Sequence, residues 1–199
     1  MRPPLASIIK ETVKRGGTVI VPAFAVERTQ KFLFMLKELM ETGQIPRLPV
    51  YSDSPMAIKA VEIFLSYTNE YGQDARNLIR QSGSPLEWSG FTFASTPEES
   101  KKINANYSPS IIISCTGMAT GGRILHHLAQ RMPDAKDTIL FIGFQAPGTR
   151  SHAIKNGALI EDIRSTDTCP GRCSGARRVQ RSRRIGQNVG LAAHVQEQA

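Results

Sequence analysis

The fold is decided by the stretch Ser114-Cys-Thr-Gly-Met-Ala-Thr-Gly-Gly-Arg123, which joins the end of a strand to the start of a helix. The strand is predicted over residues 111–113, an apolar β-branched run, and the helix over residues 123–131. Glycines in between allow positive φ and close backbone approach, so N–H groups at the helix start can point at a phosphate. The stretch therefore predicts an anion-binding turn, although such turns also serve only to pack a helix against a strand.

Three further strands end in polar or glycine-bearing loops. The strands are predicted over residues 18–21, 49–51 and 138–143, and their loops span residues 22–30, 52–55 and 144–150. In a parallel open sheet, the carboxyl ends of the strands lie along one edge, where ligands bind. We therefore expect the four loops to share one site.

Helical patterns separate these strands. We expect helices over residues 5–14, 28–42 and 56–70, a helix and loop over 73–89, a short strand at 91–93 and a helix from Thr96. Ser54 before Pro55 indicates an N-cap with proline at the first helical position. Strands that alternate with helices predict an α/β fold, with a mainly parallel open sheet and helices on both faces.

Length and composition fit one domain of a cytoplasmic protein. The chain has 199 residues, 40% of them hydrophobic, and no apolar run approaches the roughly 20 residues of a membrane span. The start lacks the apolar stretch of a secretory signal. We expect Cys115 to be a reduced packing residue, while Cys169 and Cys173 lack further zinc ligands at suitable spacing. A net charge of +8 indicates a polyanionic partner.

Four segments together resemble the β-CASP RNA-processing branch of the metallo-β-lactamase superfamily. They are Val21–Gln30, Pro49–Ala57, Ser114–Arg123 and Gly143–Arg150, and the resemblance covers residues 5–158. This branch includes ribonuclease J and the nuclease that cleaves messenger RNA at its 3′ end. The resemblance implies a β-CASP domain inserted into a metallo-β-lactamase domain, with RNA in the cleft between them and two zinc ions that serve cleavage.

The resemblance also implies which residues face that cleft. They would hold the RNA backbone, which fixes register without reading sequence. These substrate-binding residues are Ser114, Thr116, Gly117, Met118, Gly121, Gly122, Arg123, Gly148 and Thr149. Arg28 and Asp53 match positions that shape the edge of the sheet, where a fold-stabilising role is as good an interpretation as RNA contact. His152 lies near a family histidine and is the one catalytic candidate; the alternative is an ordinary histidine on a helix face.

The zinc ligands of the superfamily are missing from the sequence. Its His-x-His-x-Asp-His cluster is absent, and the only histidines are His126, His127, His152 and His194. His126 and His127 are adjacent on a predicted helix, so they face different directions. We therefore expect no metal or cofactor in this chain, with zinc in a metallo-β-lactamase domain that is missing or separately encoded. The chain would then be inactive alone, because metal-dependent hydrolysis needs positioned ligands.

The resemblance stops near residue 158, where the composition changes. The last 41 residues hold seven arginines, no lysine and no aromatic residue. We hypothesise a β-CASP-like domain over residues 1–158 and a disordered or aberrant arginine-rich tail over residues 159–199, produced by a frameshift near residue 159. The alternative is a basic RNA-binding tail, although this tail lacks the aromatic side chains that stack on bases.

Three functions stay open at this level. The first is the RNA-binding, specificity-giving portion of a zinc-dependent RNA-processing nuclease. The second is a stand-alone α/β module that binds phosphate or nucleic acid without chemistry. The third is a truncated fragment without function, since a β-CASP sheet normally docks on its partner domain, and loss of that partner exposes apolar surface.

Overall fold

The computed structural model describes residues 3–67 and 88–157. Of the helix and loop expected over residues 73–89, all but the last two residues lie outside the described residues. The arginine-rich tail over 159–199 lies outside them entirely.

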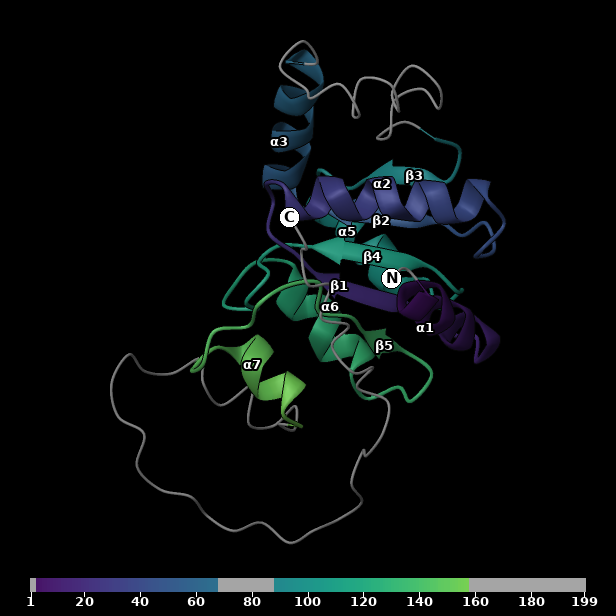
Figure 1. Ribbon diagram of the computed structural model, residues 1–199. Coiled ribbons are helices and arrows are strands. Elements are labelled where there is room, and N and C mark those ends of the chain that lie inside the picture. Colours follow the sequence, from purple (N-terminus) through teal and green to yellow (C-terminus); the bar gives the residue numbers. More distant parts are fainter. Residues whose placement is uncertain (1–2, 68–87, 158–199) are drawn as a thin grey trace, which may run out of the picture.

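Five parallel strands form one sheet in the order β3-β2-β4-β1-β5 (Figure 1). The strands are β1 Val19–Pro22, β2 Val50–Asp53, β3 Phe91–Phe93, β4 Ile111–Ser114 and β5 Thr138–Ile139. The helices are α1 Pro3–Lys14, α2 Arg28–Glu41, α3 Pro55–Ser66, α5 Pro97–Ala105, α6 Ile124–Arg131 and α7 Arg150–Lys155. None of these described helices is long and apolar enough to cross a membrane. The predicted α/β fold with a parallel sheet is confirmed.

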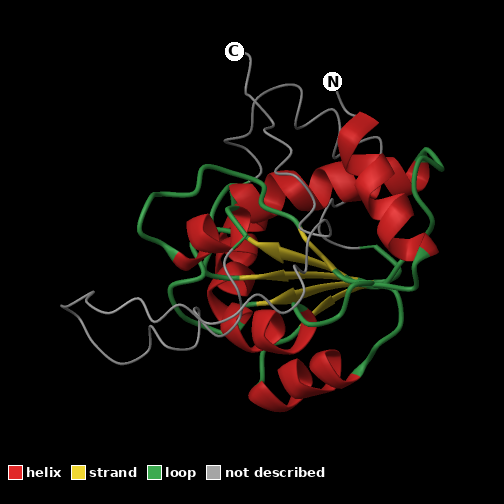
Figure 2. Cartoon of the chain, turned by 90° about the horizontal axis from the view of Figure 1, so that it is seen from below, coloured by secondary structure: helices red, strands yellow, loops and turns green. Residues whose placement is uncertain are grey.

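Helices lie on both sides of the sheet (Figure 2). Val19 and Val21 of β1 pack in a core with α1 and α2, whereas Ile20 between them packs in a second core with α6 and α7. This division follows from the two-residue period of a strand. Ile112 of β4 likewise packs against Ile103 of α5. Because both faces of the central strands are buried, these strands are continuous apolar runs in the sequence.

Side-chain caps start two helices where the sequence indicates. Ser54 Oγ accepts the Ala57 N–H at 3.2 Å, and Pro55 is the first residue of α3. Thr96 and Glu99 form a capping box at α5, in which the Thr96 hydroxyl accepts the Glu99 N–H and the Glu99 carboxylate accepts the Thr96 N–H. Both caps follow strand ends closely, so they fix how the chain turns from the sheet into the helix.

The last strand is shorter than the sequence predicts. β5 spans Thr138–Ile139 rather than residues 138–143. Among the described residues it lies at the edge of the sheet and pairs only with β1, so none of the described strands holds the chain extended on its outer side. Leu140 still donates its N–H to Ile20 O at 2.8 Å. Beyond that hydrogen bond, the chain leaves the sheet and forms the loop that precedes α7.

Candidate functional site

The loops expected to share a site leave the sheet side by side. Pro22, Asp53 and Ser114 are the last residues of β1, β2 and β4, and the parallel register pairs Ser114 with each of the other two. The Ala23 N–H also donates to Ser114 O at 3.1 Å. Adjacent strands lie about 4.8 Å apart, so the β4 loop starts about that far from each of the other two loops at the carboxyl edge.

The turn over residues 114–123 (the β4 turn) is joined to the loop over residues 140–149 (the β5 loop) and to the start of α7, which follows that loop. Ser151 donates its hydroxyl to Gly117 O at 3.1 Å and its N–H to Met118 O at 3.2 Å. The Ala146 N–H donates to Met118 Sδ at 3.5 Å. The structure therefore brings together the two segments that the sequence assigns to one site.

Two glycines of the β4 turn are required by close packing. A Cβ on Gly117 would lie 2.9 Å from a ring carbon of Phe24. A Cβ on Gly122, where φ is +81°, would lie 2.8 Å from Cys115 O. By contrast, a Cβ on Gly121 would meet no atom within 4 Å. The turn therefore requires glycine at positions 117 and 122, whereas a side chain at position 121 would extend into open space.

The hydroxyls of the β4 turn are used inside the fold. Ser114 is buried and donates to Asp53 O at 2.8 Å. Thr116 Oγ1 accepts a backbone N–H of the same turn at 3.1 Å. Within the described residues, the N–H groups of Gly121 and Gly122 form no hydrogen bond. Backbone N–H groups are therefore available to an anion, together with whichever of the Thr116 and Thr120 hydroxyls does not donate to the other.

Beneath the β4 turn, Asp53 is fully buried and has three hydrogen-bond partners. Its Oδ1 accepts from Arg123 Nη1 at 2.7 Å. Its Oδ2 accepts from His127 Nε2 at 2.6 Å and from Ser100 Oγ. Burial by itself would raise the pKa of Asp53, but the hydrogen bonds from His127, Ser100 and Arg123 outweigh burial and hold this pKa below its usual value. The ionised carboxylate connects β2 to α5 and α6.

Arg123 is turned toward this carboxylate, and only 19% of its side chain is exposed. Its terminal nitrogens also donate to Ala94 O at 2.9 Å and to Ser95 O at 2.8 Å. The guanidinium therefore fixes the end of the β4 turn to the loop after β3. Its predicted contact with RNA stays a prediction.

His127 is the site residue that sequence reasoning missed. It is fully buried, and its Nδ1 lies 2.7 Å from Asn104 Oδ1. The spacing held a signal: Arg123 and His127 are four residues apart, so both project from one face of α6 and reach Asp53. His126 is exposed instead, as expected for adjacent residues on a helix.

The catalytic candidate His152 lies outside this network, half-buried on α7. Its backbone N–H donates to Thr149 Oγ1 at 3.3 Å, which caps the helix. Gly148, with φ at +82°, shapes the turn just before that cap. Asn156 Nδ2 lies 3.2 Å from the His152 ring, and no carboxylate contacts that ring among the described residues. A role of His152 in proton transfer stays a prediction.

A zinc ion of the kind that the resemblance implies does not fit the described residues. No three His, Cys, Asp or Glu side chains among them gather as ligands. His127 and Asp53 are in contact, but the Asp53 carboxylate already accepts a hydrogen bond from Arg123, and Nδ1 of His127 is hydrogen-bonded to Asn104. Burial raises the pKa of the Cys115 thiol, which disfavours the thiolate that zinc binds. No chemical step through zinc follows from these side chains.

The parallel sheet, the glycine turn at its carboxyl edge and the buried aspartate below that turn define the class of this protein, an α/β domain with a loop-built site. The Beta-Casp domain family matches residues 29–154. The chain therefore belongs to the Beta-Casp domain family.

Individual relatives support the same assignment. Ribonuclease TTHA0252 of Thermus thermophilus is 33% identical over 141 residues, which cover 71% of this chain and 32% of that protein. Transcription termination factor FttA of Methanosarcina mazei is 34% identical over 154 residues, 77% of this chain and 24% of that protein. An RNase J-like protein of Methanocaldococcus jannaschii is 30% identical over 150 residues, 75% and 34% respectively. The chain spans a quarter to a third of the length of these curated relatives.

Proposed function

We propose that this chain is the RNA-specificity portion of an RNA-processing nuclease, and that it binds RNA without cutting it. The β4 turn and the β5 loop hold the RNA backbone, while a metallo-β-lactamase domain that carries zinc cuts the strand. Two relatives that are named as a ribonuclease and an RNase J-like protein support RNA as the substrate. The third relative is named as a transcription termination factor, which fits a nascent transcript.

One observation carries the proposal. The N–H groups of Gly121 and Gly122 form no hydrogen bond within the described residues, and a Cβ on Gly121 would meet no atom within 4 Å. Free N–H groups in a glycine-rich turn that leads into a helix are suited to a phosphate. Contacts to phosphate position a nucleic acid without reading its bases. We therefore expect binding that depends weakly on RNA sequence.

Titration of the purified chain with a single-stranded RNA oligomer at rising salt tests the proposal. We expect saturable binding whose log affinity falls with log salt by about 0.7 for each phosphate contacted. Gly121→Asp places a carboxylate in the open space of the turn, so the variant should fold like the parent. It should bind roughly tenfold more weakly at low salt, because the carboxylate repels a phosphate.

Gly121→Asn is the matched control, because it has the same size without the charge. The affinity difference between the two variants should shrink as salt screens the repulsion. Absence of RNA binding by the parent at low salt would contradict the proposal, as would equal binding by the two variants. RNA incubated with the chain should stay intact on a denaturing gel; cleavage would overturn the assignment of cutting to another domain.

A further inference from the structure

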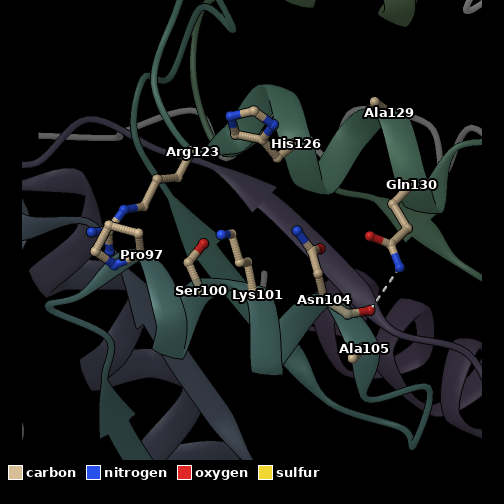
Figure 3. Close-up of a pocket in the computed structure, with 9 residues that line it drawn as sticks. All are labelled: Pro97, Ser100, Lys101, Asn104, Ala105, Arg123, His126, Ala129 and Gln130. Carbon is tan, nitrogen blue, oxygen red and sulfur yellow. Dashed lines mark hydrogen bonds between the residues drawn. The ribbon is translucent and has the colours of Figure 1, made fainter.

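A groove of about 690 Å³ lies between α5 and α6 (Figure 3). Its walls come from one face of each helix. The lining includes Ser100, Lys101 and Asn104 of α5, Arg123 at the start of α6, and His126 and Gln130 of α6. These residues recur at intervals of three or four positions, which places them on one face of each helix.

The groove starts beside the β4 turn. Both helices follow strand ends, so each begins at the carboxyl edge of the sheet and runs back along its face. Arg123 is at once the last residue of the β4 turn and a lining residue of the groove. At 1.5 Å per residue, the eight residues of α6 give the groove a length of about 12 Å.

The floor of the groove is held in place by the buried network. Ser100 donates to Asp53, and Asn104 Oδ1 lies 2.7 Å from His127 Nδ1. Gln130 Nε2 donates to Asn104 O and to Tyr107 Oη, each at 2.9 Å. These contacts hold the floor in place, and it therefore needs little rearrangement to receive a ligand.

The charge of the lining is of one sign. Lys101 reaches up from α5 and His126 stands on the opposite wall (Figure 3). Neither side chain has an ion-pair partner among the described residues. No carboxylate lines the groove, and the nearby Glu99 carboxylate is engaged in the capping box of α5. A concave surface with basic groups of one sign concentrates anions.

We propose that the α5–α6 groove carries the phosphodiester backbone of single-stranded RNA as the strand leaves the β4 turn. This proposal rests on the proposed function, because it extends the same RNA path by the length of the groove. Lys101 supplies the main charge, and the groove is suited to backbone rather than to a series of stacked bases because its lining residues include no Phe, Tyr or Trp. An acidic protein segment is the competing occupant.

Titration of the full chain with labelled oligouridylates of increasing length tests the proposal. Lys101→Gln removes the lysine that lines the groove, and Lys102→Gln removes an exposed neighbour that does not line it. With long oligomers, Lys101→Gln should lower the salt slope by about 0.7, which is about a fivefold loss of affinity at 0.1 M salt relative to 1 M. Lys102→Gln should bind like the parent, and oligomers too short to leave the β4 turn should not distinguish the two variants.

The outcomes separate this proposal from the function on which it rests. Absence of RNA binding by the parent would remove both. RNA binding that is sensitive to Gly121→Asp, with equal affinities for the two lysine variants, would overturn the groove and leave the β4 turn intact. Polyglutamate serves as the probe for an acidic protein segment. If Lys101→Gln lost binding to polyglutamate while its RNA binding was unchanged, the groove would belong to an acidic protein segment and the proposal would be overturned.

Discussion

Replacing Asp53 by alanine should lower the free energy of unfolding by about 3–5 kcal/mol, the usual cost of removing one partner from a buried ion pair. Asp53 is fully buried and accepts hydrogen bonds from Arg123 at 2.7 Å and from His127 at 2.6 Å. The alanine variant leaves a guanidinium and a buried imidazole without this acceptor. At about 2–4 °C per kcal/mol, the midpoint of thermal unfolding should fall by about 6–20 °C.

Asp53→Asn should be the milder substitution. The amide oxygen of asparagine can still accept from Arg123. Its amide N–H can donate to His127 Nε2 if the histidine proton moves to Nδ1, where Asn104 Oδ1 can accept it. The asparagine variant loses only the negative charge. A hydrogen bond to a charged group contributes about 1 kcal/mol more to stability than one between neutral groups. Glu62→Ala removes an exposed carboxylate from α3 and should unfold like the parent.

Urea unfolding of the three variants and the parent provides the measurement. An alanine variant within about 1 kcal/mol of the parent would refute the view that the network stabilises the edge of the sheet. An asparagine variant as unstable as the alanine variant would refute the hydrogen-bond argument and leave charge as the whole effect. The stability of each variant is read from its midpoint, provided that the slope stays constant.

The pH dependence gives a second readout of Asp53. Its pKa is lower in the folded state than usual, so its stabilisation is complete above the unfolded pKa of about 3.9. This stabilisation is lost as the pH falls through the folded pKa below that value. The parent should therefore lose more stability than Asp53→Asn when the pH falls below about 4.

Three further variants test other parts of the structure. Gly117→Ala should destabilise the fold by about 1–3 kcal/mol, because its Cβ would lie 2.9 Å from the Phe24 ring, whereas Gly121→Ala should unfold like the parent; urea midpoints compare them. Burial raises the pKa of Asp137, so its favourable contribution is lost as pH rises through that pKa. The free energy of unfolding of Asp137→Asn should therefore rise relative to that of the parent as the pH rises from 4 toward 7. A difference that stays constant over this range would contradict the raised pKa. Thr149→Ala should cost about 1 kcal/mol through loss of the α7 cap, Thr149→Ser should restore most of it, and equal midpoints would exclude the cap.

The fold was largely predictable because the signals for it are local. Apolar runs mark the strands, and Ser54 and Thr96 mark helix starts by residue type alone. The length of β5 was not predictable, since its residues 140–143 are as apolar as a strand and only their position at the sheet edge ends the pairing. The sequence also could not predict that the Ser114 side chain points into the fold. β4 is buried on both faces, so its residues show no alternation of polar and apolar side chains that would indicate their directions.

The site was predictable at the level of loops and not at the level of side-chain pairs. Parallel strands bring all their carboxyl ends to one edge, which is why the β4 turn and the β5 loop were expected together. The contact between Asp53 and His127 joins residues 74 positions apart. It depends on β2 lying next to β4 in the sheet order, and that order is not encoded in any local period.

The arrangement of Arg123 indicates how this edge would recognise a phosphate. Its charge is already balanced by Asp53, and three acceptors fix its two terminal nitrogens. In the proposed function, attraction for RNA would therefore come from unbonded N–H groups of the β4 turn and from Lys101 rather than from this guanidinium alone. A guanidinium that is held in advance loses little conformational freedom when an anion arrives. In the proposed function, the buried network would act on RNA binding through preorganisation of Arg123, because the Asp53 carboxylate cannot itself attract a phosphate.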